Sequence, residues 1–124
     1  MKIQDKVGIV TGAASGIGRA TTLELVTQGV KGIALVDLSE TAVVELAQQI
    51  NESAGREVAL AFAGDVTDAE FRARVFDETS HHHGIIQIMV PSAGIFRDRL
   101  AVKIERDTGE ANIYPADVFR QVLE

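Results

Sequence analysis

The sequence of 124 residues contains no cysteine and no long apolar run. Without cysteine the chain can form no disulfide and carry out no thiol chemistry, which agrees with a reducing compartment. No apolar run approaches the length of about 20 residues that spans a membrane, and none follows the N-terminus as in a secretory signal. We therefore expect a cytoplasmic protein that has no membrane partner.

Basic residues are also few and scattered. Lysine and arginine total 12 against 18 aspartates and glutamates, which gives a formal net charge of −6. Proteins that bind nucleic acid or an anionic membrane need a basic patch, and this sequence has none. The length predicts a single domain, residues 1–124, which is short for a doubly wound enzyme.

The most informative segment runs from Val7 to Gly18, with the sequence VGIVTGAASGIG. Its apolar start is typical of a buried strand, and Gly16 and Gly18 begin a helix. Because Gly12, Gly16 and Gly18 have no Cβ, a pyrophosphate can approach the backbone closely and meet the free N–H groups of the first helical turn. The segment predicts a phosphate-binding turn. We expect the helix to bury Ile17, Ala20, Leu23 and Val26.

A second apolar run, Ile33 to Val36, ends in Asp37, which lies 19 residues after Gly18. Dinucleotide-binding folds place the acceptor for the ribose hydroxyls about 20 residues after the glycines. A packing turn without a ligand is the alternative interpretation of the glycines. The strand, turn and helix context favours a cofactor site.

The chain then alternates between helices and strands. Ser39 is a candidate N-cap for a helix that ends near Gly55, with Val43, Leu46, Ala47 and Ile50 on its buried face. Val58 to Phe62 is apolar throughout, which predicts a strand buried on both faces. Thr67 and Glu70 have the spacing of a capping box, and Phe71, Val75 and Phe76 give the next helix its buried side. Ile85 to Val90 forms a fourth strand.

Strand and helix alternate four times, which predicts an α/β fold. With right-handed crossovers the strands form a Rossmann-like, doubly wound parallel sheet in the order 3-2-1-4, with helices on both faces. Residues 97–114 predict a β-hairpin insertion, and an apolar stripe from Val118 to Leu123 begins a helix after Pro115. Because the sequence stops inside that stripe, we expect an incomplete, truncated domain.

His81, His82 and His83 are adjacent near the end of the third helix. Consecutive residues of a helix point in different directions, so three adjacent histidines do not converge on one metal ion. We interpret them as exposed residues and predict no metal site.

The turn and its context resemble the short-chain dehydrogenase/reductase family, whose glycine motif has the form TGxxxGIG. The likeness runs from about Lys6 to Ile95. It implies that NAD is the cofactor, because Asp37 would repel a 2′-phosphate and Ser15 replaces the basic residue common in NADP-preferring members. It also implies that Asp65 bonds the adenine amine and that Val66 packs on the adenine ring. The implied cofactor-binding residues are Gly12, Ser15, Gly16, Ile17, Gly18, Asp37, Leu38, Asp65, Val66, Ser92, Ala93 and Gly94.

Two positions depart from the family pattern. Pro91-Ser92-Ala93-Gly94 stands where the family usually has Asn-Asn-Ala-Gly. Pro91 has no N–H and Ser92 has a shorter reach, so the sequence does not predict the bonds that usually join this strand to its neighbours. Ala93 and Gly94 keep the floor of the implied cofactor site open.

The resemblance implies a hydride transfer between NAD and a small alcohol or carbonyl substrate in a full-length form. Family catalysis uses a serine and a Tyr-x-x-x-Lys arrangement, whereas the one tyrosine here, Tyr114, is followed four residues later by Val118. We therefore assign no catalytic residue and predict that this chain alone is inactive. The alternative is a non-catalytic NAD or adenine-nucleotide-binding or interaction module. Methyl transfer from S-adenosylmethionine fits the turn less well. The unpaired edge of Ile85 to Val90 predicts a homo-oligomer.

Overall fold

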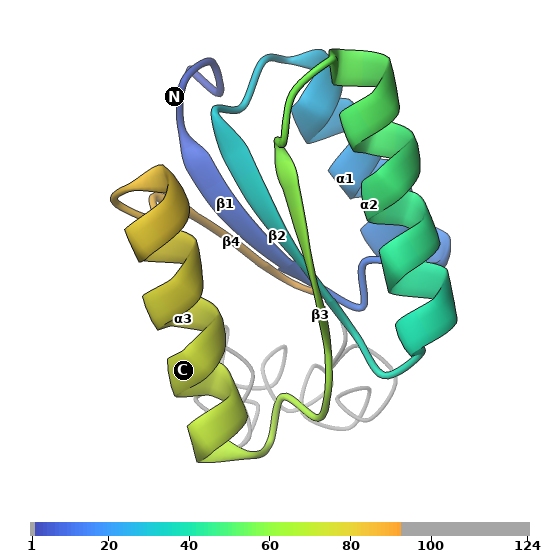
Figure 1. Ribbon diagram of the computed structural model, residues 1–124, viewed down its shortest axis with the longest axis vertical. Helices are drawn as coiled ribbons and strands as arrows, with labels where there is room; N and C mark the ends of the chain where they lie inside the picture. The colour runs from blue at the N-terminus through green and yellow to red at the C-terminus, as the bar shows by residue number, and fades with distance from the viewer. Residues whose placement is uncertain (1, 93–124) are drawn as a thin grey trace, which may run out of the picture.

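The structure, a computed structural model, describes residues 2–92. Its elements follow one another as strand and helix in strict alternation (Figure 1). They are β1 (Val7–Thr11), α1 (Gly16–Thr27), β2 (Gly32–Asp37), α2 (Glu40–Ala54), β3 (Ala59–Ala63), α3 (Ala69–His83) and β4 (Ile88–Pro91). The predicted hairpin at 97–114 and the apolar stripe after Pro115 lie outside the described residues.

The four strands form one parallel sheet in the order β3-β2-β1-β4, which confirms the predicted topology. Thr11 at the end of β1 lies opposite Val36 on one side and Pro91 on the other. Figure 1 shows α1 and α2 on one face of the sheet and α3 on the opposite face. The carboxyl ends of all four strands therefore meet at one edge of the molecule.

The core consists of two layers because side chains alternate along each strand. Val10, Ile33 and Leu35 point toward α1 and α2, where Leu46 and Ile50 pack against them. The neighbouring strand residues Ile9, Ala34, Val36 and Phe62 point the other way, where they pack with Val66 of the loop after β3 and Val75 of α3. No helix within residues 2–92 is both long and apolar enough to cross a bilayer.

The buried face of α1 differs from the prediction. Ile17 is 65% exposed, Leu23 is 38% exposed and Ala20 is also exposed. Gly18, Thr22 and Leu25 are buried instead, and the hydroxyl of Thr22 donates to the Gly18 carbonyl at 2.8 Å. The close contact of Gly18 with the glycine turn sets the rotation of the helix, so the residues four and seven positions later face the sheet. Apolar residue type alone did not indicate this face.

The predicted capping box of α3 is wrong in its capping residue. Asp68, not Thr67, is the N-cap, and its carboxylate accepts the Glu70 N–H at 3.0 Å. The Thr67 hydroxyl instead donates to Asp65 at 2.8 Å. At the N-terminus of α2 the predicted cap is confirmed, since Ser39 accepts the Ala42 N–H at 3.3 Å.

The third strand is less buried than its apolar sequence predicts. In β3 only Ala59 and Phe62 are buried, and the other three residues are half-buried. The reason is position: β3 is an edge strand that pairs with β2 alone among the described strands. An apolar run does not distinguish a central strand from an edge strand that helices cover.

The three histidines at the end of α3 do not share one environment. His81 and His82 are exposed as predicted, but His83 is only 6% exposed. Its ring lies against Gly32 so closely that a Cβ on that glycine would overlap the ring. Burial lowers the pKa of the His83 imidazole, and His82, Arg56 and Lys31 lower the pKa further while Glu57 opposes them.

Candidate nucleotide-binding site

The turn between β1 and α1 depends on glycine at two positions. Gly12 and Gly16 have φ values of 67° and 55°, a region that residues with a Cβ rarely adopt. Between them the Ala13 N–H donates to the Val36 carbonyl at 3.1 Å, so the turn continues the pairing of β1 with β2. The turn is therefore held against the carboxyl end of β2.

The last two glycines of the motif have opposite surroundings. A Cβ on Gly18 would overlap the Gly12 carbonyl and crowd the hydroxyl of Ser92, so this position must lack a side chain for α1 to approach the turn. A Cβ on Gly16 would meet no atom within 4 Å. The open side of Gly16 gives a ligand direct access to the backbone at the start of α1. These residues fit a diphosphate group at this helix terminus.

Among the three described helices, α1 alone begins without a side-chain cap. Ser15 at its N-cap makes no capping hydrogen bond, and its first turn holds no acidic residue. In contrast, Ser39 caps α2 and Asp68 caps α3, and each of those helices has a glutamate in its first turn. The first-turn N–H groups of α1 thus keep their partial positive charge for an anion.

Asp37 connects the end of β2 to the glycine turn. One oxygen of its carboxylate accepts the Ala14 N–H at 3.0 Å, and the other accepts the Ser39 N–H at 3.1 Å. Each carboxylate oxygen can accept a second hydrogen bond, so the orientation is fixed while acceptor capacity remains. The sequence predicted Asp37 and the glycines in one site, and the structure joins Asp37 to Ala14, which lies between Gly12 and Gly16.

The loop after β3 carries the next two predicted residues. Asp65 is exposed, and its carboxylate accepts the Thr67 N–H and hydroxyl at 2.9 and 2.8 Å. Val66 is 8% exposed and packs with the core residues under α3. The Asp65 carboxylate thus has a local structural role, which the sequence also allows for an aspartate before a helix.

The end of β4 is tied to β1 despite the unusual Pro91-Ser92 pair. The Ser92 hydroxyl donates to the Thr11 carbonyl, and the Thr11 hydroxyl donates to the Val90 carbonyl at 3.5 Å. Serine thus bonds across to the neighbouring strand, although its short reach did not predict such a bond. Ala93 and Gly94 lie outside the described residues.

Two exposed apolar side chains complete the set of predicted residues. Ile17 follows the open glycine, and Leu38 follows Asp37 and is 77% exposed. Of the ten predicted residues that the structure describes, Asp37 is the last residue of β2 and the other nine lie in the segments that follow the four strands. This edge is where parallel α/β sheets bind their ligands.

Sequence reasoning missed three residues of this edge. Ala14 supplies the N–H that holds Asp37, Thr11 bonds to β4, and the guanidinium of Arg72 donates to the Val66 carbonyl at 2.8 Å. Ala14 contributes only its backbone N–H to the bond with the Asp37 carboxylate, and Arg72 reaches back from α3. No sequence pattern distinguishes either residue. Thr11 stands inside the glycine motif, so its position was a usable signal.

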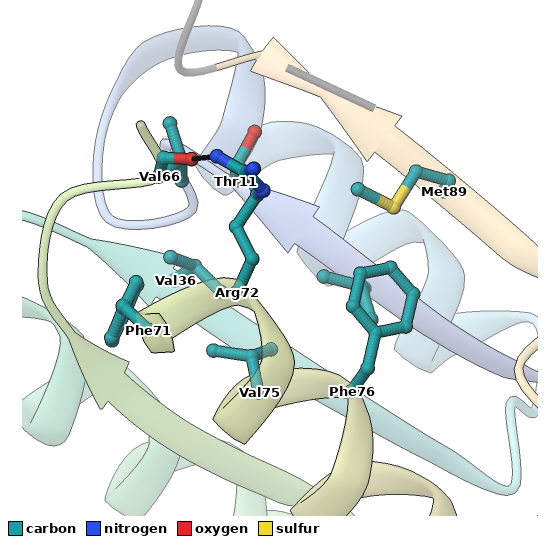
Figure 2. Close-up of a pocket in the computed structure, with 9 residues that line it drawn as sticks. Thr11, Val36, Val66, Phe71, Arg72, Val75, Phe76 and Met89 are labelled. Carbon is teal, nitrogen blue, oxygen red and sulfur yellow. Dashed lines mark hydrogen bonds between the residues drawn. The ribbon is translucent and has the colours of Figure 1, made fainter. Parts of the chain in front are cut away.

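A shallow apolar hollow lies below this edge, between α3 and the sheet (Figure 2). It encloses about 270 Å³, part of which is open to solvent. Its lining includes Ile9, Thr11, Val66, Arg72, Phe76 and Met89. Within the described residues no group of three or more His, Cys, Asp or Glu side chains is placed to hold a metal ion.

Known proteins are similar to this chain in both sequence and fold. The family model described as short chain dehydrogenase matches residues 6–122. The 3-oxoacyl-[acyl-carrier-protein] reductase of Thermotoga maritima is 34% identical over 113 residues, which cover 91% of this chain and 45% of that protein. D-threitol dehydrogenase of Mycolicibacterium smegmatis is 40% identical over 96 residues, which cover 77% of this chain and 36% of that protein.

A solved structure agrees with these relatives. The short-chain dehydrogenase/reductase from Burkholderia phymatum, described as a complex with NAD, superposes with a TM-score of 0.65 at 25% identity. The superposition covers 72% of this chain and 31% of that one. The chain thus spans less than half the length of each of these relatives. The chain belongs to the short-chain dehydrogenase family of oxidoreductases.

Proposed function

We propose that residues 1–124 form the NAD-binding part of an oxidoreductase that transfers hydride between NAD and a small alcohol or carbonyl compound. The observation that carries the proposal is the contact between the Asp37 carboxylate and the glycine turn, at 3.0 Å from the Ala14 N–H. It supports the proposal because a carboxylate that can accept from two ribose hydroxyls lies beside a helix terminus suited to phosphate. An adenosine diphosphate group needs both features within one site.

The charge of Asp37 also supports a preference for NAD over NADP. A carboxylate bonds to a vicinal diol, whereas a 2′-phosphate at the same place would meet a like charge. Ser15, which precedes Gly16, adds no positive charge that would compensate. The Burkholderia phymatum relative was solved with NAD, which agrees with this choice of cofactor.

When bound, NAD supplies the hydride chemistry, and the residues of this chain bind and orient it. Gly16 and the first turn of α1 would hold the diphosphate, Asp37 would hold the adenine ribose, and Val66 would face the adenine. Because the single tyrosine, Tyr114, lacks a lysine four residues later, we propose that this chain alone does not turn over substrate. In a longer form, the tyrosine and lysine of the family's Tyr-x-x-x-Lys arrangement would carry the proton transfer.

Calorimetric titration of the chain with NAD, NADP and AMP tests the proposal. We expect NAD and AMP to bind and NADP to bind more weakly. A charge-assisted hydrogen bond contributes roughly 1.5 to 3 kcal/mol, so Asp37→Ala should raise the Kd for NAD by about one to two powers of ten. Glu45→Ala, an exposed acidic position on α2, is the matched control and should leave the Kd unchanged.

Two results would contradict the proposal. The first is a wild-type chain that binds none of the three nucleotides. The second is an Asp37→Ala variant that remains folded by circular dichroism and binds NAD as tightly as the Glu45→Ala control.

A further inference from the structure

The loop that carries Asp65 and Val66 contacts the rest of the molecule at both of its ends. At its start the Gly64 N–H donates to the Asp37 carbonyl at 3.0 Å, which aligns it with the end of β2. The bonds from Thr67 to Asp65 lie within the loop and shape it without fixing its height above the sheet. At the other end of the loop the Val66 side chain is buried in the core under α3, and a side chain of that helix also bonds the Val66 carbonyl.

Arg72 supplies that contact. Its guanidinium Nη1 donates to the Val66 carbonyl at 2.8 Å, a span of six residues from α3 back into the loop. Figure 2 shows the Arg72 side chain extending from α3 toward Val66, with the hydrogen bond at its tip. Arg72 is half-buried, so its bond is better shielded from water than a bond on the surface.

Arg72 occupies a position on α3 that by itself disfavours a cation, so a specific contact must account for it there. Arg72 is the fourth residue of α3. It lies near the N-terminus of the helix, where the partial positive charge of the helix dipole disfavours a cation. Phe71 beside it packs on Gly64, where a Cβ would overlap the Phe71 ring. Two adjacent residues of α3 therefore support the loop, one at Gly64 and the other at Val66.

We propose that Arg72 is a positioning residue for the nucleotide, which holds Val66 at the height at which it faces the adenine ring. The inference rests on the proposed function, because it assumes that the adenine lies over this loop. Arg72 acts through the Val66 carbonyl and does not itself contact the nucleotide. Its effect should therefore appear with every ligand that contains adenosine.

The test compares Arg72→Met with Arg74→Met. Methionine keeps the apolar stem in the hollow but removes all the donors of the guanidinium. Arg74 is two residues away, and it is exposed and pairs with Glu78 at 3.7 Å on the solvent side of α3. The guanidinium of Arg74 also lies 5.4 Å from the centroid of the Phe71 ring. The matched change there removes the same charge and leaves the bond to the Val66 carbonyl intact.

Calorimetric titration with NAD and with AMP should show the Kd of both raised about three- to tenfold in Arg72→Met. In Arg74→Met both values should stay within about twofold of the wild type, since exposed pairs contribute little. Arg72→Lys keeps one long-chain donor and should recover part of the affinity. Thermal unfolding without ligand identifies the temperature at which all variants are fully folded, and the titrations are made there.

Three outcomes would overturn the inference. In the first, folded Arg72→Met binds NAD and AMP like the wild type, which refutes the positioning role and leaves the proposed function standing. In the second, Arg74→Met weakens binding as much as Arg72→Met, which shows that the effect does not depend on the bond to the Val66 carbonyl. In the third, the wild-type chain binds neither nucleotide, which removes the proposed function as well.

Discussion

At the scale of single residues, the glycines of one motif have separate physical roles. Gly12 and Gly16 take backbone angles that disfavour a side chain, whereas Gly18 lies where a Cβ would overlap the Gly12 carbonyl. The sequence predicts that all three are needed for a close turn. It cannot rank them, because the cost of a Cβ depends on which atoms lie beyond each Cα.

Substitution by alanine should separate these roles. Gly18→Ala forces backbone atoms apart and should lower the free energy of unfolding by about 3 kcal/mol. Gly16→Ala meets open space and should cost about 1 kcal/mol from its positive φ, yet it should weaken NAD binding because the new methyl group occupies the approach to the backbone. Urea denaturation and calorimetric titration measure the two effects. Equal loss of stability in the two variants would contradict this division of roles.

At the scale of elements, the two ends of α3 are fixed by different contacts. Asp68 caps its N-terminus, and at its C-terminus the buried His83 ring lies against Gly32 of β2. Beside it His82 contacts Glu57 at 2.8 Å. The sequence predicted a helix here and its end at Gly84, but not which of three adjacent histidines faces the sheet. That choice follows from the rotation of the helix, which distant packing contacts set.

The buried histidine predicts a pH-dependent stability. Because burial lowers the pKa of His83 below its ordinary value of 6.5, the unfolded chain takes up this proton at higher pH than the folded chain does. The stability that His83 contributes is therefore fully present above pH 6.5. It is lost as the pH falls from 6.5 toward the lowered pKa of the folded state.

Urea denaturation of wild type, His83→Gln and His81→Gln between about pH 7.5 and pH 5 measures how His83 changes the dependence of stability on pH. This range spans the ordinary pKa of histidine. We expect His83→Gln to reduce the slope of stability against pH, while His81→Gln, at an exposed position, keeps the wild-type slope. The interpretation fails if the two variants show the same slope.

At the scale of the whole molecule, the strand order leaves both outer strands with one described partner each. Beyond β1, β4 has no neighbour within residues 2–92, and β3 is likewise bonded to β2 alone. Unpaired edges of this kind promote association with other chains. The hollow beside α3 adds accessible apolar surface on one face of the sheet.

We accordingly expect the chain to form a homo-oligomer in solution. Size-exclusion chromatography with light scattering should give a mass that is a multiple of that of the chain, because edge pairing joins two identical strands. The measured mass should fall on dilution if the association is reversible. The measurement should cover about a hundredfold range of concentration around a micromolar Kd. A monomeric mass over that whole range would refute this expectation.

The sequence by itself determined the class of fold, and it predicted the residues of a candidate site at one edge of the sheet. Alternating apolar runs and helical periods specify four parallel strands with crossover helices, since each element must bury its apolar side. The glycine spacing and the distance to Asp37 are local features of the chain, so they could be read without coordinates. Asp37 does contact the turn, as that spacing implied.

The tertiary structure alone decided which faces and which atoms meet. The rotation of α1 about Gly18, the choice of Asp68 as a cap, the burial of His83 and the reach of Arg72 to Val66 each differ from the sequence prediction or were missed by it. Each depends on contacts between elements that are distant in the sequence or on backbone geometry at an element's end. A pattern of residue types records that a side chain can be buried or bonded, but the packing of neighbours selects its partner.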